Sequence, residues 1–494
     1  MAAPRIDLPP RRFYLGNEFL DSVKPIGDKL TLLNPVDDSV VADDVPVAGK
    51  EDVDRAVALG REAFRKGPWA KFTGLQRSAC LNKFADLVEK NVERLAYAES
   101  LPTGRPIAGI IHFDLAHMVQ VFRWWADKIA GESFGEDNGF AKLVRYKPLG
   151  VCAGIASWNA TFMYVGWKVA PALAAGNSFI FKPSEKSPLG VLALAPLFAE
   201  AGFPPGVVQF VTGGRDTGSL LASHMEIAKI SFTGSIAAGK AVQEAATRSN
   251  LKKTTLELGG KSPALVFGDA DFENAVGSVA GGFLANSGQI CVGTAASRVL
   301  VEESIATKFL AAAKATFDGI GAQMGSSPLE LSTGHGPVVD KLQFDRIMSY
   351  IDKGKASAQL LTGGKRIGSK GCFIEPTLFV NPDPQSPIWK EEVFGPVLTV
   401  RTFKTEEEAI AMANDSIYGL AACVYTSDVS RALRVSAALE SGGVAINSPY
   451  LPELNTPFGG TKQSGQGREL GAHGLYSYLE PQSVHIRITE ASKL

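Results

Sequence analysis

Hydrophobic residues in the first quarter of the chain are spaced as in amphipathic helices. Apolar side chains recur every three or four positions, which predicts helices over residues 51–65, 77–101 and 112–129. The segment 102–106 contains two prolines and a glycine, and it is predicted to end the second helix. Residues 1–50 are interrupted by prolines and predict an extended arm with short strands.

The pattern changes after residue 150, where short apolar runs alternate with helical segments. Such alternation is typical of a doubly wound α/β fold with a parallel sheet. A second series from 297 to about 444 predicts a second α/β domain. The predicted strands of the first series are residues 151–155, 178–182, 207–211, 227–232 and 264–267, and one predicted helix is 190–202.

Two segments far apart in the sequence alternate apolar and polar residues, as strands with one buried face do. They are residues 139–148 and 478–488. Each stands outside an α/β series, so both are expected to leave the globular body and pair within or between subunits. The sequence therefore predicts a small β element for oligomerisation, in a homodimer or homotetramer.

Composition and charge exclude several classes of protein. A chain of 494 residues is too long for one hydrophobic core, so two or three domains are expected. The net charge of -1 gives no electrostatic reason to expect nucleic acid or an anionic membrane as a partner. The longest apolar stretch, 165–181, contains Lys168, Pro171 and Asn177, so no membrane span is predicted.

The cysteines and the two ends of the chain bear on the compartment. The 5 cysteines are scattered without a Cys-x-x-Cys pair, so neither a disulfide framework nor a zinc site is expected, and no other metal. The N-terminus lacks the apolar core of a secretory signal. The C-terminal Ser492-Lys493-Leu494 predicts recognition by a peroxisomal import receptor. A cytoplasmic location is the alternative.

Cys291 and Glu257 are the pair of residues that most directly indicates chemistry. Both lie beside glycines, which let a ligand approach the backbone. A cysteine thiolate attacks carbonyl carbons well, and a carboxylate can activate the water that later releases an acyl group. Together these residues favour oxidation of an aldehyde through a thioester.

Two loops after predicted strands have features of a dinucleotide site. Gly234, Ser235 and Gly239 span a turn into a helix, whose free N–H groups favour a phosphate; alone, this is equally well a simple tight turn. Lys182 and Glu185 are suited to ribose hydroxyls, and a carboxylate there would repel a 2′-phosphate, which favours NAD over NADP. The alternative for that pair is a solvated surface loop.

Two further loops carry weaker signals. Asn159 follows a predicted strand, and its amide is a neutral donor suited to an oxyanion, although buried structural asparagines are common. Glu392 and Phe394 combine a group for ribose with a ring that can pack on a ligand.

Taken in order, these motifs resemble the aldehyde dehydrogenase superfamily over nearly the whole chain. The segments that carry the resemblance are Ser157-Trp-Asn159, Lys182-Pro-Ser-Glu185, Phe232-Thr-Gly-Ser235, Glu257-Leu-Gly-Gly-Lys261, Gly288-Gln-Ile-Cys291, Glu391-Glu-Val-Phe-Gly-Pro396, Asn447, Pro457-Phe-Gly-Gly460 and Ser464 to Gly471.

The resemblance implies a role for each matching position. Cys291 is the implied nucleophile, Asn159 and the backbone N–H of Cys291 the oxyanion hole, and Glu257 the base that activates water. Lys168 and Glu469 match positions that assist proton movement in some members. The implied NAD-binding residues are Ile155, Trp158, Lys182, Ser184, Glu185, Gly234, Ser235, Gly239, Glu392 and Phe394.

The resemblance also implies a fold and a division of the chain. The expected fold is two doubly wound α/β domains plus the small β oligomerisation element. The expected NAD-binding domain comprises 1–130 and 149–259, and the catalytic domain 260–477. The oligomerisation element and tail comprise 131–148 and 478–494.

Departures from the family pattern bear on the substrate. Ala160 and Ala285 stand where relatives that oxidise betaine aldehyde or aminoaldehydes tend to have aromatic walls, while Tyr164, Trp167 and Phe458 keep aromatic character. Loss of two walls weakens recognition of a cation by aromatic rings. A wide apolar tunnel for a bulky aliphatic or aromatic aldehyde is therefore expected.

Two smaller departures concern the loops. Ser157 stands where many members have proline, and Pro102 replaces an acidic residue that is frequent in the family.

Three alternatives to this interpretation remain at the level of sequence. One is an aminoaldehyde or betaine-aldehyde dehydrogenase. Another is a relative that passes the acyl group to CoA, against which Glu257 argues because that subgroup tends to lack the base. The third is a protein that binds NAD without catalysis, against which the intact Cys291, Glu257 and Asn159 argue.

Overall fold

The computed structural model describes residues 7–23, 27, 29–126, 132–137, 140–291 and 296–487. The predicted import signal Ser492-Lys493-Leu494 lies outside the described residues, so it stays a prediction. Gly139, the first residue of the predicted strand 139–148, and Ile488, the last of the predicted strand 478–488, also lie outside the described residues. The same holds for the end of the predicted helix 112–129.

The first sheet has eight strands and is parallel through its centre. Its order is β19-β11-β10-β7-β8-β9-β1-β2, with the edge strands antiparallel to their neighbours. Four central strands, β7 to β10, are buried along their whole length, as expected where helices cover both faces. The strands are β1 (Phe13–Leu15), β2 (Glu18–Leu20), β7 (Val151–Ile155), β8 (Ser178–Lys182), β9 (Val208–Phe210), β10 (Lys229–Thr233), β11 (Lys253–Glu257) and β19 (Gly465–Gln466).

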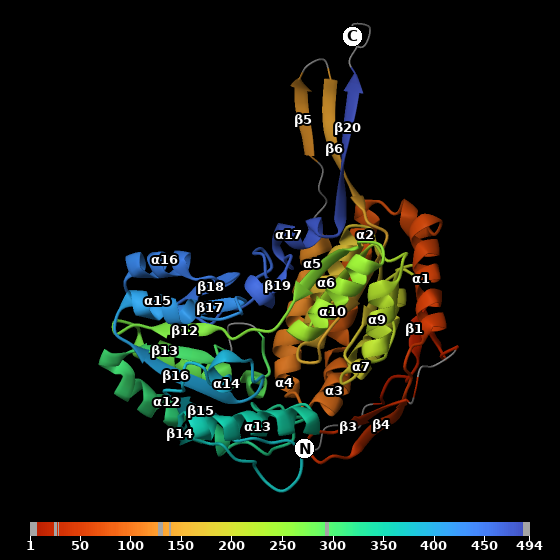
Figure 1. Cartoon of the computed structure of the whole chain (residues 1–494). Coiled ribbons are helices and arrows are strands. Elements are labelled where there is room, and N and C mark those ends of the chain that lie inside the picture. The colour runs from red at the N-terminus through yellow and green to blue at the C-terminus, as the bar shows by residue number, and fades with distance from the viewer. Residues whose placement is uncertain are drawn as a thin grey trace.

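The second sheet has seven strands in the order β14-β15-β16-β13-β12-β17-β18, and all but β14 run parallel. It lies beside the first sheet in Figure 1. Its strands are β12 (Pro263–Val266), β13 (Arg298–Glu302), β14 (Gln359–Thr362), β15 (Thr377–Val380), β16 (Val397–Phe403), β17 (Ala421–Tyr425) and β18 (Gly443–Ile446); a separate hairpin is β3 (Leu30–Leu33) and β4 (Val40–Val45).

Helices pack against both sheets, which confirms the predicted α/β fold. Those of the first part are α1 (Lys50–Arg65), α2 (Gly74–Lys90), α3 (Val92–Thr103), α4 (Ile107–Gly109), α5 (Ala116–Ala126), α6 (Thr161–Ala174), α7 (Pro188–Leu194), α8 (Pro196–Glu200), α9 (Arg215–Ser223) and α10 (Ile236–Arg248). Those of the second are α11 (Phe272–Val276), α12 (Ala306–Gly321), α13 (Lys341–Ser357), α14 (Pro387–Lys390), α15 (Glu406–Asn414) and α16 (Val429–Ala438), while α17 (Gly471–Tyr476) packs against α6.

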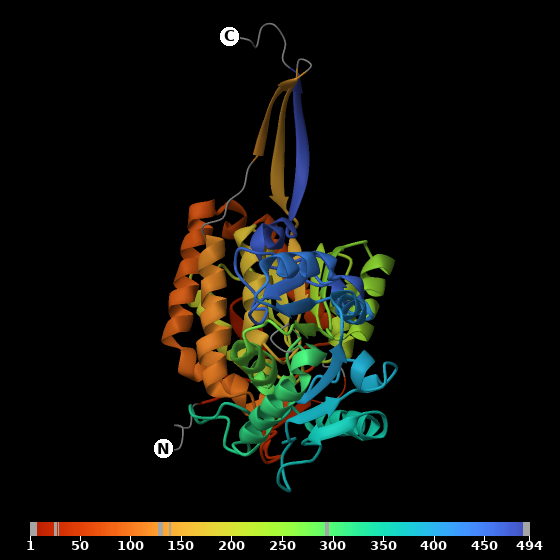
Figure 2. The same cartoon turned by 90° about the vertical axis from the view of Figure 1, so that its left-hand side faces the viewer.

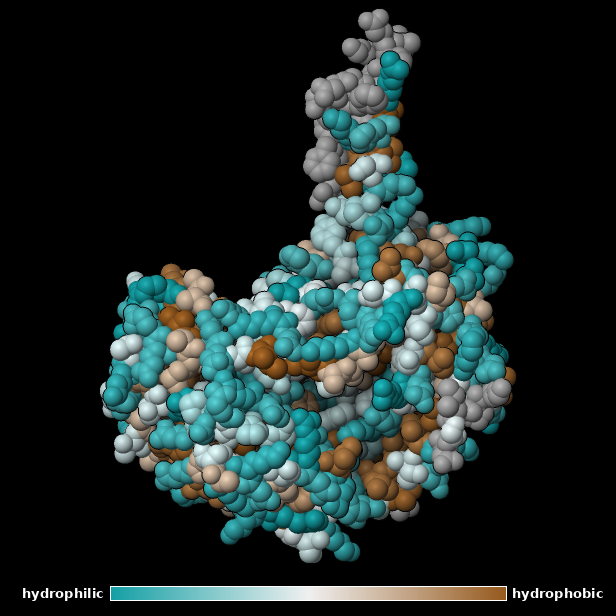
Figure 3. Space-filling view, viewed as in Figure 1, coloured by the Kyte–Doolittle hydropathy of each residue, from teal (hydrophilic) through white to brown (hydrophobic). Residues whose placement is uncertain are grey.

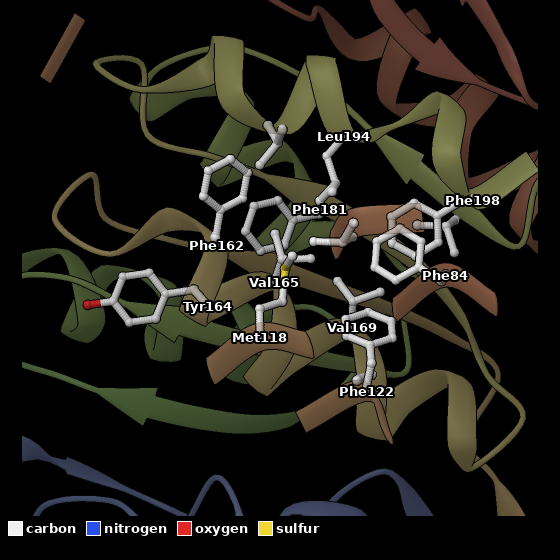
Figure 4. Packing of buried hydrophobic residues seen from close by; sticks show 14 of the residues in the cluster. Phe84, Met118, Phe122, Phe162, Tyr164, Val165, Val169, Phe181, Leu194 and Phe198 are labelled. Atoms are coloured by element: carbon white, nitrogen blue, oxygen red, sulfur yellow. The ribbon is translucent and has the colours of Figure 1, made fainter. Parts of the chain in front are cut away.

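The largest apolar core lies between the first sheet and the helices α2, α5 and α6. Phe84 from α2 stacks on Phe198 with ring centroids 4.0 Å apart and contacts Phe122 of α5 at 4.5 Å. Figure 4 shows Val165 and Val169 of α6 within the same cluster. Close packing of this kind fixes α6, which carries several of the predicted site residues.

The three-stranded sheet β20-β6-β5 projects from the body as a stalk (Figures 1 and 2). Its strands are β5 (Glu132–Asp137), β6 (Phe140–Pro148) and β20 (Leu479–Arg487). β20 pairs with β6 antiparallel from Leu479↔Pro148 to Arg487↔Phe140. The two alternating segments of the sequence therefore pair with each other inside one chain.

The sequence predicted one helix over 77–101, and this prediction is wrong in its bounds. The structure has two helices there, α2 and α3, with a break at Asn91. The Asn91 side chain donates to the carbonyl of Leu87 at 2.8 Å and so satisfies the C-terminus of α2. The following helix runs through Pro102 and ends at Gly104, whose φ of 66° suits glycine. Pro102 has no N–H to extend the ladder, and the helix ends one residue after it.

Two further helix predictions differ from the structure. Helix 190–202 begins at Pro188 and divides into α7 and α8 around Ala195. The first residues of the predicted helix 112–129 lie in a π-helical segment, Ile110–Leu115, and α5 begins after it.

No helix among the described residues is long and apolar enough to span a membrane. None of the 5 cysteines, all of which lie among the described residues, forms a disulfide, and Cys291 is the only one of them that is not classed as buried.

Candidate active site

The predicted site residues gather at the carboxyl ends of the parallel strands of the first sheet. Asn159 follows β7, Lys182 ends β8, Gly234 follows β10 and Glu257 ends β11. Open α/β sheets bind ligands at this edge because loops diverge there and helix N-termini face it. The arrangement thus follows from strand direction alone.

Cys291 is presented by a tight turn just before it. Asn286 and Ser287 both have positive φ, 48° and 53°, which is a strained conformation for residues other than glycine. Gln289 holds the turn, since its side chain donates to Asn286 at 3.0 Å and accepts from the N–H of Val339 at 2.9 Å. A buried glutamine thus supports the conformation that places Cys291 at the cavity.

Cys291 lies between two cavities. The larger has a volume of about 360 Å³ and is mostly apolar; Asn159, Ala160, Tyr164, Trp167 and Ala285 also line it. The smaller has a volume of about 10 Å³ and is lined by Gly260, Glu392 and Phe394 as well as Cys291. Cys291 therefore borders both spaces, and only the larger one has room for an organic reactant.

Asn159 is held from both its side chain and its backbone. Ser157 Oγ donates to Asn159 Oδ1 at 2.7 Å, and Tyr164 Oη donates to the same oxygen at 3.0 Å. The backbone carbonyl accepts from Arg105. The amide nitrogen is left as the available donor.

Burial dominates the electrostatics at Cys291. It raises the pKa of the Cys291 thiol to about 11, and the hydrogen bond from Tyr164 acts in the opposite direction. The carboxylates of Glu392 and Glu257 raise that pKa further. Without substrate and cofactor, the thiol is therefore the dominant form near neutral pH.

Glu257 is buried next to a second acidic group. Desolvation first, and repulsion from Glu469 second, raise its pKa well above the usual range, while Lys168 lowers it. Lys168 Nζ donates to Glu469 Oε1 at 2.7 Å and to Ser231 Oγ at 3.0 Å, and Ser231 donates to Glu469 at 2.9 Å. The structure thus brings Lys168 and Glu469 together behind the predicted base.

The glycine turn lies at the start of α10, where the sequence placed it. Ser235 is the N-cap of this 13-residue helix, and its Oγ accepts from the N–H of Ala238 at 3.3 Å. A side chain at Gly239 would collide with Leu258, whose methyl lies 2.5 Å from the added carbon. The turn therefore presents a helix N-terminus that suits a phosphate.

Lys182, Ser184 and Glu185 form the adjacent strand end. Lys182 Nζ donates to the carbonyls of Pro183 at 2.9 Å and Gly213 at 2.7 Å, and burial lowers its pKa to about 8. Glu185 is exposed, so its carboxylate is available to hydroxyl groups. Ile155 lies at the same edge of the sheet, since it is paired with Lys182 across β7 and β8.

Glu392 and Phe394 reach the same region from the second sheet. Glu392 Oε1 accepts from the N–H of Gly260 at 2.9 Å. Phe394 has a φ of 58° and packs edge-on against Trp158, with centroids 5.5 Å apart. Two carboxylates, an ammonium, a helix N-terminus and an aromatic wall fit the hydroxyls, phosphates and ring of a nicotinamide dinucleotide.

Of the three predicted substrate residues, two line the larger cavity and one does not. Tyr164 and Trp167, on one face of α6, line the larger cavity. Phe458 is buried and is not among the residues lining it, but its ring lies 4.8 Å from that of Trp167. Phe458 therefore supports the wall from behind.

Arg105 and Asp114 are the main site residues that the sequence did not reveal. Arg105 Nη2 donates to Asp114 Oδ1 at 2.6 Å, and Arg105 lines the larger cavity. Burial raises the pKa of Asp114 to about 6, with the nearby guanidinium acting to lower it. Residues 102–106 were interpreted only as a helix breaker; a charged residue between two prolines was the available signal.

The cavity wall has a second neighbour that the sequence did not indicate. Trp167 Nε1 donates to His117 Nε2 at 2.9 Å, and burial lowers the pKa of His117 to about 4. His117 is therefore a neutral acceptor that orients the indole. In the described part of the chain, His, Cys, Asp and Glu side chains nowhere form a group of three that could hold a metal ion.

Known proteins match nearly the whole length of this chain. A model described as the aldehyde dehydrogenase family matches residues 23–484. An aldehyde dehydrogenase of Emericella nidulans is 44% identical over 489 residues, which cover 98% of this chain and 96% of that protein.

Solved structures show the same fold. A gamma-glutamyl-gamma-aminobutyraldehyde dehydrogenase from Burkholderia cenocepacia superposes with a TM-score of 0.93 at 38% identity, covering 98% of both chains. An indole-3-acetaldehyde dehydrogenase of P. syringae, solved in complex with NAD+ and IAA, has a TM-score of 0.93 at 38% identity and covers 97% of both.

Proposed function

This chain belongs to the aldehyde dehydrogenase family and is an NAD-dependent aldehyde dehydrogenase, and we propose that it oxidises bulky aliphatic or aromatic aldehydes through a thioester on Cys291. One observation carries the proposal: Cys291 and Asn159 line the same apolar cavity of about 360 Å³.

The first step is addition of Cys291 to the aldehyde. Cys291 reacts as the thiolate, the form that the last step releases, so that the Sγ–carbon bond forms and the carbonyl π electrons move onto oxygen. Asn159 Nδ2 and the backbone N–H of Cys291 donate to this oxygen, because charge develops there in the transition state. The buried apolar surroundings strengthen both hydrogen bonds.

NAD, when bound, supplies the acceptor for the hydride that the tetrahedral carbon loses. Lys182, Glu185 and Glu392 are the residues that would hold its riboses, and the start of α10 its phosphates. The exposed Glu185 carboxylate favours NAD over NADP, since it would repel a 2′-phosphate.

The last step is hydrolysis of the acyl group from Cys291. Glu257 takes a proton from water, the water oxygen bonds to the acyl carbon, and the carbon–sulfur bond breaks with release of the thiolate. Burial and Glu469 raise the pKa of Glu257, which makes it a stronger base, and Lys168 limits that rise.

The shape and charge of the cavity support a bulky neutral substrate. Ala160 and Ala285 add little volume to its walls, and Arg105 is the only charged side chain among the described residues that line it. A cationic aldehyde would meet no carboxylate there and one positive guanidinium. The named indole-3-acetaldehyde dehydrogenase shares the fold, which accords with an aromatic substrate.

The proposal is tested by NADH formation from a panel of short and long aliphatic, aromatic and amino-aldehydes, with and without CoA. Bulky or aromatic aldehydes should give the highest kcat/KM, independent of CoA. Cys291→Ala should abolish turnover, while Cys80→Ala, at a thiol remote from the cavity, should keep it. Preference for amino-aldehydes would overturn the substrate assignment, and NAD binding without any turnover would favour a non-catalytic relative.

A variant that fills the cavity separates substrate size from catalytic competence. Ala285→Phe should lower kcat/KM for bulky aldehydes by about tenfold or more, because the added ring occupies part of the cavity. Short aliphatic aldehydes should react nearly as well as with the wild type. Equal losses for both classes would mean that the variant disturbs Cys291 and not the available space.

We also propose that the stalk makes the protein a homodimer or homotetramer. β20 carries exposed residues along most of its length, including Ile486 at 49% exposure, and Figure 3 shows hydrophobic and hydrophilic groups side by side on the stalk. Light scattering after gel filtration should give a mass of two or four chains. Ile486→Lys should lower that mass, whereas a monomeric wild type would contradict the proposal.

A further inference from the structure

Two hydroxyl groups converge on the amide oxygen of Asn159. Ser157 lies two residues before it and Tyr164 one helical turn after it, so both reach the same side of the loop. Asn159 and Tyr164 are 4% and 2% exposed. Few water molecules can compete with these hydroxyls, so the contacts decide how the amide is turned.

Tyr164 also contacts the reacting sulfur. Its Oη lies 3.8 Å from Cys291 Sγ, within hydrogen-bonding reach of sulfur. Figure 4 shows that the ring of Tyr164 stands at the edge of the apolar cluster with its oxygen directed away from it. Burial raises the pKa of Tyr164 well above 10, so the hydroxyl keeps its proton throughout the working pH range.

The phenol has a single proton, which it can give to one acceptor at a time. While Cys291 is a thiol, the S–H can donate to Tyr164 Oη, and Tyr164 donates to Asn159 Oδ1. Once Cys291 is a thiolate, the negatively charged sulfur is the stronger acceptor of the phenolic proton. Asn159 then needs another donor to keep Oδ1 turned away from the developing oxyanion, and Ser157 is placed to be that donor.

We propose that Ser157 is a positioning residue that holds the Asn159 amide, and that Tyr164 is a catalytic residue whose hydroxyl stabilises the Cys291 thiolate. The inference rests on the thioester chemistry proposed above. It gives a purpose to Ser157 at a position where many relatives have proline, since proline has no hydroxyl to donate. The two hydroxyls act together: because Ser157 donates to Asn159 Oδ1, the hydroxyl of Tyr164 is free to donate to the sulfur.

Thiol alkylation tests the role of Tyr164 without any turnover. Iodoacetamide labelling of Cys291, followed by mass spectrometry across a pH series, reports the thiolate fraction, with Cys291→Ala as the background. Tyr164→Phe keeps the ring in the cavity wall and removes only the hydroxyl. Its labelling midpoint should move to higher pH, by about half a unit or more if the hydrogen bond has a usual strength. An unmoved midpoint would overturn this half of the proposal, whatever the enzyme's substrate proves to be.

Steady-state kinetics test the role of Ser157. Ser157→Ala should lower kcat by about tenfold with KM changed little. An Asn159 amide in the wrong orientation weakens stabilisation of the transition state but not binding of the substrate. Ser157→Thr keeps the hydroxyl and should restore most of the rate, while Ser157→Pro should behave like the alanine variant. An unchanged kcat in Ser157→Ala, or no rescue by threonine in variants with wild-type Tm, would overturn it.

Discussion

Lys168 on α6 and Glu469, 301 residues further along the chain, form a buried ion pair with 2.7 Å between Nζ and Oε1. The pair lies behind Glu257, and its two charges act on that carboxyl in opposite directions. Removal of one partner leaves the other charge buried and unbalanced. In the proposed mechanism, the pair therefore shifts the pH at which Glu257 becomes an effective base.

Substitutions at the two ends of this pair should shift the pH profile in opposite directions. Lys168→Met removes the charge that lowers the pKa of Glu257, so the rise of the hydrolysis rate should move to higher pH. Glu469→Gln removes the repulsion that raises it, so the rise should move to lower pH. Single-turnover thioester hydrolysis measures both, and shifts of the same sign would contradict the arrangement.

Glu257→Gln should separate the two halves of the reaction. Hydrolysis needs a base, whereas transfer of the hydride does not, so NADH should form in a rapid burst of about one equivalent per active site and then slowly. Stopped-flow absorbance measures the burst. The loss of both burst and steady state would mean that Glu257 is needed before the thioester forms.

Glu185→Ser should relax the choice of cofactor. The variant lacks the carboxylate that would repel a 2′-phosphate, so kcat/KM for NADP should rise relative to that for NAD by about tenfold. Kinetics with each cofactor at a fixed aldehyde concentration give the ratio. Lys186→Ser, at the next position, is the matched control and should leave the ratio close to that of the wild type.

Glu99→Gln should stabilise the protein at alkaline pH but not at acid pH. Burial raises the pKa of Glu99 to about 8, with Thr161 and Arg105 acting against burial and Asp114 with it. The folded state therefore binds a proton that the unfolded state has lost, and wild-type stability falls as pH rises from about 4.5 to 8. The neutral glutamine does not titrate.

The difference in Tm between Glu99→Gln and the wild type should thus be small at pH 5 and grow up to about pH 8. Thermal melts across this range give the difference. The exposed substitution Glu185→Gln is the control and should show no such trend. A difference that is independent of pH would mean that Glu99 is already ionised in the folded protein.

The helices and strands show where local pattern is sufficient and where it fails. Strands 151–155 and 178–182 were predicted with the bounds that the structure has, because continuous apolar runs between turns are a local signal. The break at Asn91 was missed, since both flanking segments have the same helical spacing. Asn91 ends α2 through a hydrogen bond to Leu87 that the apolar pattern does not reveal.

The candidate site was predictable where motif and strand end coincide. Asn159, Lys182 and Gly234 were placed at the carboxyl edge because parallel strands all end on one side. Arg105 was not, since its contacts with Asn159 and Asp114 depend on how two helices and a loop pack together. The backing of Trp167 by His117 and Phe458 was missed for the same reason.

The sequence by itself determined the α/β class and the residues at the strand ends, because periodicity and turn chemistry act over a few neighbouring positions. The family followed from the resemblance of its motifs, taken in order along the chain. Only the tertiary structure decided the 360 Å³ cavity, the Lys168–Glu469 pair and the two hydroxyls on Asn159. These depend on burial and on distances of a few ångströms between segments that chain folding brings together. Burial also sets the pKa values of Cys291 and Glu257, so the reactivity of the site is a property of the folded molecule.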